Sequence, residues 1–394
     1  MNTKDYKIKT IFKACNNRPS VELNANVWNI GIDIGYSGVK VMAPNTLVCF
    51  PSFAREAQGS TSFNLSVAPE DNTSIRYRDE NGQEWLVGAA AQDSISASDT
   101  TAGSLSAYGR HRYYSPMFKV LFRTGIAAGL TQNQYGDPEG KLINIQTGLP
   151  PRYLNDETDL RDVIMTEHHF EVKFGDGPWK KYDIDLKSDN NIMPALAQPI
   201  GTLVSIATNK NFQPSQSAAA YFTQKMLLMD GGFGTMDYVP IKKGQVTLAE
   251  CETDETLGMK RVLSDTATEI FKQYGFEVSV PAMQQYLETG VVPAKTGRVY
   301  KKMPFDELLE KNSRRICELA INKAMDVYPL QEYHGLIITG GTCAAWSNFI
   351  RENEFFREGD VIEIISGNQG DPDLPYIFSN VRGYYIFGMT NYRG

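Results

Sequence analysis

Cysteine is scarce in this chain, with 5 residues among 394, and none of them has the C-x-x-C spacing of a zinc site or a redox motif. Scattered cysteines in odd number predict reduced, mostly buried thiols in a cytosolic protein and exclude a disulfide framework. Histidine is equally scarce, with 4 residues. The neighbouring His168 and His169 would point to opposite faces of a strand, so they cannot share a metal ion. The cysteines are Cys15, Cys49, Cys251, Cys317 and Cys343.

Long apolar runs and an excess of positive charge are also missing. No uninterrupted apolar stretch is long enough to span a bilayer, and the N-terminus lacks the apolar core of a signal peptide. The formal net charge of -7 argues against general DNA binding by the chain itself. We therefore expect a cytoplasmic protein without membrane attachment and without direct contact to nucleic acid, so any nucleic-acid role would go through a partner.

The chain has enough apolar sequence for two domains. Hydrophobic residues make up 42% and aromatic residues 11% of its length, which allows a sizeable core. In both halves, runs typical of strands alternate with runs typical of helices, which predicts an α/β protein with mixed sheets. We expect helices near residues 115–130, 258–274 and 344–353, a hairpin over residues 74–87, and strands over residues 191–194 and 246–250.

Two apolar runs each end in an aspartate that is followed at once by a glycine-rich turn. Asp33 precedes the turn at residues 35–38, and Asp230 precedes the turn at residues 231–235. Glycine lets backbone N–H groups approach phosphate oxygens, and the two carboxylates suit a hydrated Mg²⁺, which takes few protein ligands. Two such turns, with a third glycine pair within residues 339–342, predict a phosphate clamp built from two related half-domains.

Residues 1–27 form a polar N-terminal extension with several lysines. The spacing of Ile8, Ile11 and Phe12 predicts a short helical face. This face would either touch a membrane or a neighbouring subunit, or pack on the body of the protein. A second basic stretch at residues 108–123 favours a subunit contact or a packed helix start over nucleic-acid binding, because the chain as a whole is acidic.

The order of these motifs resembles that of the actin, Hsp70 and sugar-kinase superfamily. Residues 31–37, 148–150 and 380–384 resemble the motif forms of the bacterial ParM-like (StbA-like) plasmid-segregation actins, and the resemblance covers nearly the whole chain after the N-terminal extension. It implies an α/β, actin-like (ribonuclease H-like) two-domain fold with a nucleotide cleft between the domains. We expect domain I at residues 28–200, with a small subdomain at about 51–110 and completion by about 375–394, and domain II at residues 201–374, with a small subdomain at about 260–330.

The resemblance also implies a binding site for ATP, with GTP as the other possibility, and for Mg²⁺. Asp33 and Asp230 would hold the metal ion, through water, and both count as catalytic together with Gln198. Gln198 would orient the attacking water, since an amide both donates and accepts hydrogen bonds; alternatively, it caps a turn. ParM itself has an acidic residue at the catalytic position, so the match is nearer to actin here.

The nucleotide-binding candidates lie in the three turns and at the start of a predicted helix, which in relatives borders the ribose and the base. Phe233 departs from the usual form of the family by standing between glycines, and Lys40 is alternatively a solvated charge on a return strand. Asp237 is either a supporting group behind the site or exposed. The candidates are Gly35, Tyr36, Ser37, Gly38, Lys40, Gly231, Gly232, Phe233, Gly234, Thr235, Glu255, Gly258, Lys260, Gly340, Gly341 and Thr342.

By the same resemblance, we expect an ATPase that couples hydrolysis to polymerisation into a filament of its own copies. The filament would segregate plasmid DNA through a DNA-binding adaptor protein at a centromere-like site. Two alternatives stay open. A small-molecule kinase of the same superfamily needs a sugar-binding acid near the cleft, for which the sequence offers no clear candidate. A membrane-associated scaffold would use the N-terminal extension as its anchor.

Overall fold

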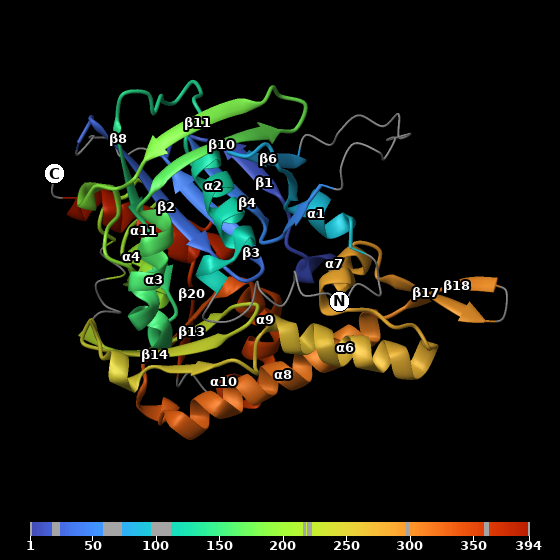
Figure 1. The fold of residues 1–394 in the computed structure, drawn as a ribbon. Coiled ribbons are helices and arrows are strands. Elements are labelled where there is room, and N and C mark those ends of the chain that lie inside the picture. Colours follow the sequence, from blue (N-terminus) through green and yellow to red (C-terminus); the bar gives the residue numbers. More distant parts are fainter. Residues whose placement is uncertain are drawn as a thin grey trace.

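The computed structural model describes residues 2–17, 24–57, 73–95, 112–215, 218, 223–296, 299–357 and 362–392. Two mixed sheets, each covered by helices, make up its body (Figure 1). The sequence prediction of an α/β protein with mixed sheets is therefore confirmed.

The first sheet has the strand order β1-β4-β3-β2-β8. Strand β2 pairs antiparallel with β3 and parallel with β8, while β4 pairs antiparallel with β3 and with β1. All residues of β2 and β4 are buried, as expected for strands covered on both faces. The five strands are β1 (Ile11–Ala14), β2 (Val27–Ile34), β3 (Gly38–Ala43), β4 (Thr46–Pro51) and β8 (Leu142–Gln146).

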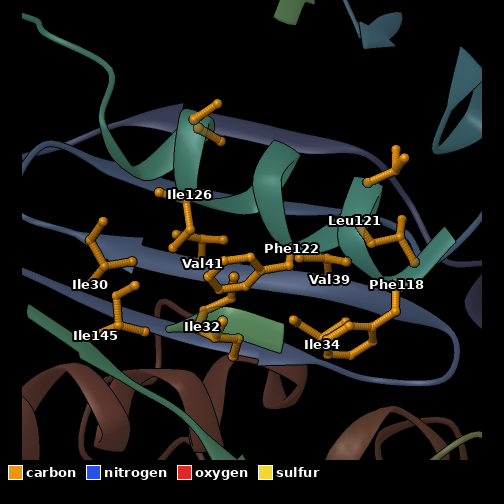
Figure 2. Packing of buried hydrophobic residues seen from close by; sticks show 14 of the residues in the cluster. Ile30, Ile32, Ile34, Val39, Val41, Phe118, Leu121, Phe122, Ile126 and Ile145 are labelled. Carbon is orange, nitrogen blue, oxygen red and sulfur yellow. The ribbon is translucent and has the colours of Figure 1, made fainter. Parts of the chain in front are cut away.

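Helix α2 (Pro116–Gly129) covers one face of the first sheet. The helix begins where the Ser115 side chain accepts a hydrogen bond from the N–H of Phe118, with Pro116 in the first turn. Figure 2 shows the contact, in which alternate residues of β2 and β3 meet one side of the helix. The residues are Ile30, Ile32, Ile34, Val39 and Val41 of the sheet, Ile145 of β8, and Phe118, Leu121, Phe122 and Ile126 of the helix.

The second sheet repeats the plan of the first. Strand β13 pairs antiparallel with β14 and parallel with β19, and β20 follows in parallel, while β15 and β16 pair with β14. The duplicated motif predicted two related half-domains, and β13 has the same kinds of neighbours as β2: an antiparallel strand on one side and a parallel strand on the other. The strands are β13 (Lys225–Gly231), β14 (Met236–Lys242), β15 (Gln245–Val246), β16 (Glu252–Asp254), β19 (Gly335–Thr339) and β20 (Glu363–Ser366).

Two helices join the halves. Helix α4 (Gln198–Ile206) packs on the second sheet through Leu203 and Ile206, and α11 (Ser379–Asn391) packs on the first sheet through residues such as Val381. The two helices cross where Gly201 faces Gly383 so closely that a methyl group on Gly383 would overlap the carbonyl oxygen of Gly201. Glycine at this crossing lets the two halves approach each other.

The remaining elements surround these sheets. A smaller sheet with the order β11-β10-β6-β7-β5 lies beside α2, and its hairpins include the one predicted at residues 74–87. The bounds are β5 (Ala54–Glu56), β6 (Ile75–Asp79), β7 (Glu84–Val87), β9 (Gly148–Leu149), β10 (Glu167–Phe174), β11 (Lys180–Asp185), β12 (Leu196–Ala197), β17 (Val291–Thr296), β18 (Val299–Pro304), α1 (Ala89–Asp93), α3 (Glu157–Ile164), α6 (Met259–Tyr274), α7 (Val280–Leu287), α8 (Asp306–Val327), α9 (Gly340–Glu352) and α10 (Glu354–Arg357). Short 3₁₀ helices span Thr3–Tyr6, Arg112–Tyr114, Pro151–Asp156, Asp189–Asn191, Leu248–Glu250, Leu330–Glu332 and Tyr376–Phe378.

Three local predictions were wrong. The helical face predicted around Ile8 and Ile11 is absent: Ile11–Ala14 is a strand, because the edge of β4 offers it a complete ladder of backbone hydrogen bonds. Residues 191–194 form only a single bridge, between Ile192 and Ile145. Residues 246–250 end the short strand β15 and turn through a 3₁₀ helix.

Among the described residues, no helix is both long and apolar enough to cross a membrane.

Candidate functional site

The two glycine turns face each other across a cavity of about 710 Å³. At one edge of the cavity the turns lie close together: a Cβ added to Gly234 would lie 2.9 Å from Cδ2 of Tyr36. Most of the predicted site residues line this cavity, and they come from both sheets and from three separate turns. The lining includes Asp33, Gly35, Tyr36, Ser37, Lys40, Gln198, Asp230, Gly232, Phe233, Thr235, Gly340, Gly341 and Thr342.

The first turn brings a lysine onto an aspartate. Asp33, near the end of β2, is the cross-strand partner of Lys40 on β3, and Lys40 Nζ lies 2.9 Å from Asp33 Oδ2. The two side chains are only 12% and 7% exposed, so Lys40 is not a solvated charge. Burial is the largest single influence and lowers the pKa of Lys40, but the charge and the hydrogen bond of Asp33, with further contributions from Cys49 and Asp230, together raise it. Lys40 therefore places a fixed positive charge at the cavity wall.

The second turn places Asp230 opposite. Its Oδ2 accepts a hydrogen bond of 2.7 Å from Nδ2 of Asn380 on α11. Burial raises the pKa of Asp230 to about 6, against the hydrogen bond from Asn380, and the nearby Asp33 adds to the rise. Gly340 lies directly behind, with φ +81°, and a side chain there would overlap Asp230 Oδ1. Only glycine fits this conformation and this approach without strain.

The third glycine pair supports the second turn. Oγ1 of Thr342, in the first turn of α9, donates a hydrogen bond of 2.6 Å to the carbonyl oxygen of Gly232. Strands β13 and β19 run parallel, with Asp230 paired to Thr339. Because parallel strands end at the same edge, the turns that follow them meet there. This register explains why residues more than a hundred positions apart line one cavity.

The aspartates suit a metal ion that is held chiefly by other ligands. Asp33 Oδ1 is buried and has no hydrogen-bond partner in the described part of the chain. A buried carboxylate oxygen without a partner is costly, so a group that supplies positive charge or a donor fits there. The described residues contain no cluster of three or more metal-binding side chains. A site with two carboxylates suits Mg²⁺, because this ion keeps several water ligands and binds phosphate oxygens.

Comparison with known proteins identifies the fold. Residues 31–201 match the family model for the N-terminal domain of actin-like proteins. A 15-stranded ParM filament from Clostridium botulinum superposes with a TM-score of 0.69 at 20% identity, over 93% of this chain and 99% of that one. The chain has an actin-like fold. The fold class predicted from the motifs is thereby confirmed.

Other structures of the same fold agree over the same share of the chain. A non-polymerisable quadruple mutant of pCBH ParM has a TM-score of 0.67 at 21% identity, over 93% of this chain and 100% of that one. ParM from Bacillus thuringiensis with ATP has a TM-score of 0.58 at 14% identity, over 93% and 99%. No curated protein sequence matches the chain. The likeness thus defines the actin-like fold, at identities that leave the function open.

Gln198 is placed by the actin-like fold at the wall of the cavity. The short strand β12 pairs in parallel with β9 and ends at Ala197, so that Gln198 begins α4. Pro199 stands in the first helical turn, where its missing N–H costs nothing. The residue lines the cavity, half-buried, a position from which an amide can reach a bound molecule. Its role in orienting water stays a prediction.

Three predicted residues lie behind the second turn rather than at the cavity. The N–H of Lys260 donates to the carbonyl oxygen of Phe233 at 2.8 Å, and a Cβ on Gly258 would lie 2.5 Å from that same oxygen. Glu255 accepts a hydrogen bond from the hydroxyl of Tyr153. The start of α6 thus fixes the Phe233 turn. Contact of these residues with a ribose or a base stays a prediction. Gly38, Gly231 and Gly234 shape the turns without lining the cavity.

Asn380 and Arg112 are two of the cavity residues that were not predicted as site residues. Asn380 stands in a motif that carried the family resemblance, yet nothing local in the sequence points from it to Asp230. Arg112 was assigned to a subunit contact or a helix start, but it donates a hydrogen bond to the carbonyl oxygen of Ile34. Its guanidinium lies 4.6 Å from the ring centre of Tyr36. Arg112 therefore stacks on the first turn and adds positive charge to the cavity.

A second buried carboxylate stands behind Asp230. Asp237 pairs across the hairpin with Asp230 and is 1% exposed. It accepts hydrogen bonds from Oγ1 of Thr253 at 2.5 Å and from Oγ1 of Thr235 at 3.3 Å. Burial, and after it the charge of Asp230, raises the pKa of Asp237 from 3.8 to about 7 despite these two donors. Of the two open alternatives, Asp237 is thus the supporting group and not an exposed one.

Asp237 is expected to make the nucleotide-free protein less stable as pH rises from 4 to 7. In that range the folded protein keeps a proton on Asp237 that the unfolded chain has lost, so the free energy of unfolding falls, by a few kcal/mol for this group. Asp237→Asn removes the titration and keeps an acceptor for Thr253. Urea unfolding at pH 5 and pH 8 should show a smaller fall for the variant than for wild type. Equal falls for both proteins would contradict the burial argument.

Proposed function

We propose that the chain is an ATPase that binds Mg²⁺ and ATP in the cavity and assembles into filaments of its own copies. One observation carries the proposal: the two glycine turns face each other, with Asp33 and Asp230 buried at one cavity and Lys40 beside them. Opposed turns of this kind offer backbone donors to a polyphosphate from two sides. A cation beside them balances its charge.

In the mechanism we propose, each residue has one task. Asp33 and Asp230 would hold Mg²⁺ through its water ligands, and the ion neutralises phosphate charge when bound. Lys40 stays protonated because of its Asp33 partner, and so it attracts the phosphates. Gln198 orients the attacking water by hydrogen bonds without acting as a strong base, which suits slow hydrolysis. Arg112 holds Tyr36 and closes the first turn.

Filament formation is supported by the structures that share the fold. One of them is a 15-stranded ParM filament, and ParM from Bacillus thuringiensis is known with ATP and with ADP. On this basis we infer that ATP favours assembly and that hydrolysis weakens it. We further infer a cytoplasmic role in plasmid segregation. Because the chain carries net negative charge, it would reach the DNA through a DNA-binding adaptor protein at a centromere-like site.

Assembly is expected to depend on the triphosphate. Light scattering and pelleting should rise on addition of Mg-ATP, with Mg-GTP as the test of base preference, and decay as phosphate is released; Mg-ADP should give little assembly. Sedimentation that finds only monomers with every Mg-nucleotide would contradict the filament proposal. Turnover without assembly would direct attention to the alternative, a small-molecule kinase, which a coupled assay for ADP with added acceptors detects.

The membrane scaffold is the less favoured alternative. Its anchor would be the N-terminal segment, but Ile8 and Ile11 pack against the core beside α11. Tyr6 is only 5% exposed. These three side chains are therefore packed within the fold, whereas Phe12, also part of the predicted apolar face, is 38% exposed.

A further inference from the structure

Residues 2–17 run from the second half of the fold to the first, along the cavity. We call this segment the strap. Its start lies beside α7 (Figure 1), and its end forms strand β1 of the first sheet. Residues 2, 4–9 and 11 of the strap line the cavity. The matched family model begins at residue 31 and does not include the strap.

The strap is fixed to the second half by two buried hydrogen bonds. Oγ1 of Thr3 donates to the carbonyl oxygen of Leu287, at the end of α7, over 2.8 Å. The hydroxyl of Tyr6 shares a hydrogen bond of 2.7 Å with Oγ of Ser313 on α8. Ser313 also accepts from Nε1 of Trp346 at 2.8 Å. These bonds form in low dielectric and connect positions about three hundred residues apart, so they fix the strap specifically.

Two ion pairs add to this attachment at the surface. Lys4 Nζ lies 2.9 Å from Glu288 Oε1, and Lys7 Nζ lies 3.2 Å from Glu288 Oε2. The side chains of Lys4 and Glu288 are about half exposed, so water and salt screen the pairs and their contribution is small. The buried bonds of Thr3 and Tyr6 are therefore the main attachment to the second half.

The attachment to the first half is more extensive. Strand β1 pairs with β4 over four residues. Nδ2 of Asn17 donates to the carbonyl oxygens of Ala43 and Thr46 at 3.1 and 3.0 Å, and the hydroxyl of Tyr385 on α11 donates to the carbonyl oxygen of Asn17 at 2.6 Å. Because this end has a backbone ladder and the other end has two side-chain bonds, the strap should detach first at Tyr6.

The middle of the strap lies on the first glycine turn. A Cβ on Gly38 would lie 3.3 Å from Cγ2 of Ile8, and Ile8 and Lys9 both line the cavity. Only four residues separate Tyr6 from Ile11, so these anchors can move apart to at most about 17 Å in a fully extended chain. The halves cannot open widely at this edge while both ends of the strap hold.

We propose that the strap keeps the two halves together across the cavity and retains the nucleotide there, so that release requires the Tyr6 end to detach. This inference rests on the proposed nucleotide site. It assigns the N-terminal segment to that site, as a wall on the side of the first turn. It also predicts that nucleotide exchange is limited by the strap and not only by contacts of the phosphates.

Cutting the strap after folding tests the proposal. A specific protease site made by substitution within residues 7–10, and not by insertion, keeps the length of the strap and leaves both attachments in place, and the uncut form of this variant is the matched control. Release of fluorescent ADP, chased with unlabelled ATP, should become about tenfold faster after cutting, because the halves can then separate without first breaking the two buried hydrogen bonds of Thr3 and Tyr6. Tyr6→Phe should give a smaller increase, about threefold, since one bond is lost. Lys13→Ala, an exposed change on β1 away from the cavity, should leave the rate unchanged.

Small-angle X-ray scattering of the nucleotide-free protein provides a second readout. The radius of gyration should increase on cutting if the strap restrains the halves. If the protein binds no nucleotide either before or after cutting, the proposed function and the role of the strap in retaining nucleotide are both refuted. The scattering measurement would then still show whether the strap holds the halves together. Equal release rates in cut and uncut protein, with bound nucleotide, would overturn the strap proposal even if the ATPase proposal stands.

Discussion

Replacing Asp230 by asparagine is expected to slow phosphate release from ATP by about 10²-fold or more, while the protein stays folded. The new amide keeps the size of the side chain and an acceptor for Asn380, which donates to Asp230 at 2.7 Å. It removes the negative charge that would hold the waters of Mg²⁺. Because burial raises the pKa of Asp230 to about 6, the charge is costly at neutral pH, and the variant should be at least as stable as wild type.

The opposite signs of these two effects separate a lost function from a lost fold. Phosphate release and thermal unfolding should be measured on the same preparation at pH 7.5, a value chosen because it lies about a unit or more above the pKa of Asp230. Asp326→Asn, at an exposed position on α8, is the matched control and should change neither quantity. Turnover at the wild-type rate in Asp230→Asn would remove Asp230 from the mechanism, whatever the stability.

Gly383→Ala is expected to destabilise the protein by about 3 kcal/mol, at the upper end of the range for overpacking. The added methyl group would overlap the carbonyl oxygen of Gly201. A backbone atom cannot rotate away as a side chain can, so α4 and α11 must separate. Since α4 packs on the second sheet and α11 on the first, their separation disturbs the joint between the halves. Urea unfolding monitored by circular dichroism measures the loss.

Gly388→Ala on the same helix is the control. Both substitutions gain about 1 kcal/mol of helix propensity, so the difference between them reports the collision. A Cβ on Gly388 would lie 3.1 Å from Cβ of Gln146 and 3.6 Å from Nδ2 of Asn144, so a shift of a few tenths of an ångström relieves the contact, whereas a Cβ on Gly383 would overlap the carbonyl oxygen of Gly201. We therefore expect a net change within about 1 kcal/mol for this variant. Similar losses for both variants would show that the helix crossing is not close-packed in solution.

The elements predicted correctly are those whose cause is local. The turn after Asp33 and the turn after Asp230 were found because glycines, a carboxylate and an apolar run stand next to each other in sequence. The hairpin at residues 74–87 follows from Asn81-Gly82, and Gly82 adopts φ +81° as such a turn requires. His168 is buried and His169 exposed on the same strand, as the alternation of a strand demands.

The elements predicted wrongly, or missed, depend on partners distant in sequence. Ile8 and Ile11 have a spacing that suits a helix, but the free edge of β4 decides the structure of that segment. Arg112 and Asn380 become site residues only through contacts with Tyr36 and Asp230. No local pattern marks such contacts, because an arginine or an asparagine in a polar stretch has many possible partners. Folding, and not spacing, selects among them.

Because Asn380 on α11 donates a hydrogen bond to Asp230, the order in which the chain is synthesised affects when the site can form. Helix α11 follows β2 by more than three hundred residues and is therefore made long after it, yet α11 supplies the hydrogen bond to Asp230 and packs on β2. A nascent chain that has not released residues 379–391 lacks this bond and exposes the apolar face of its first sheet. Such unfinished chains should therefore depend on chaperones. The fold thus delays completion of the candidate site until α11 has left the ribosome.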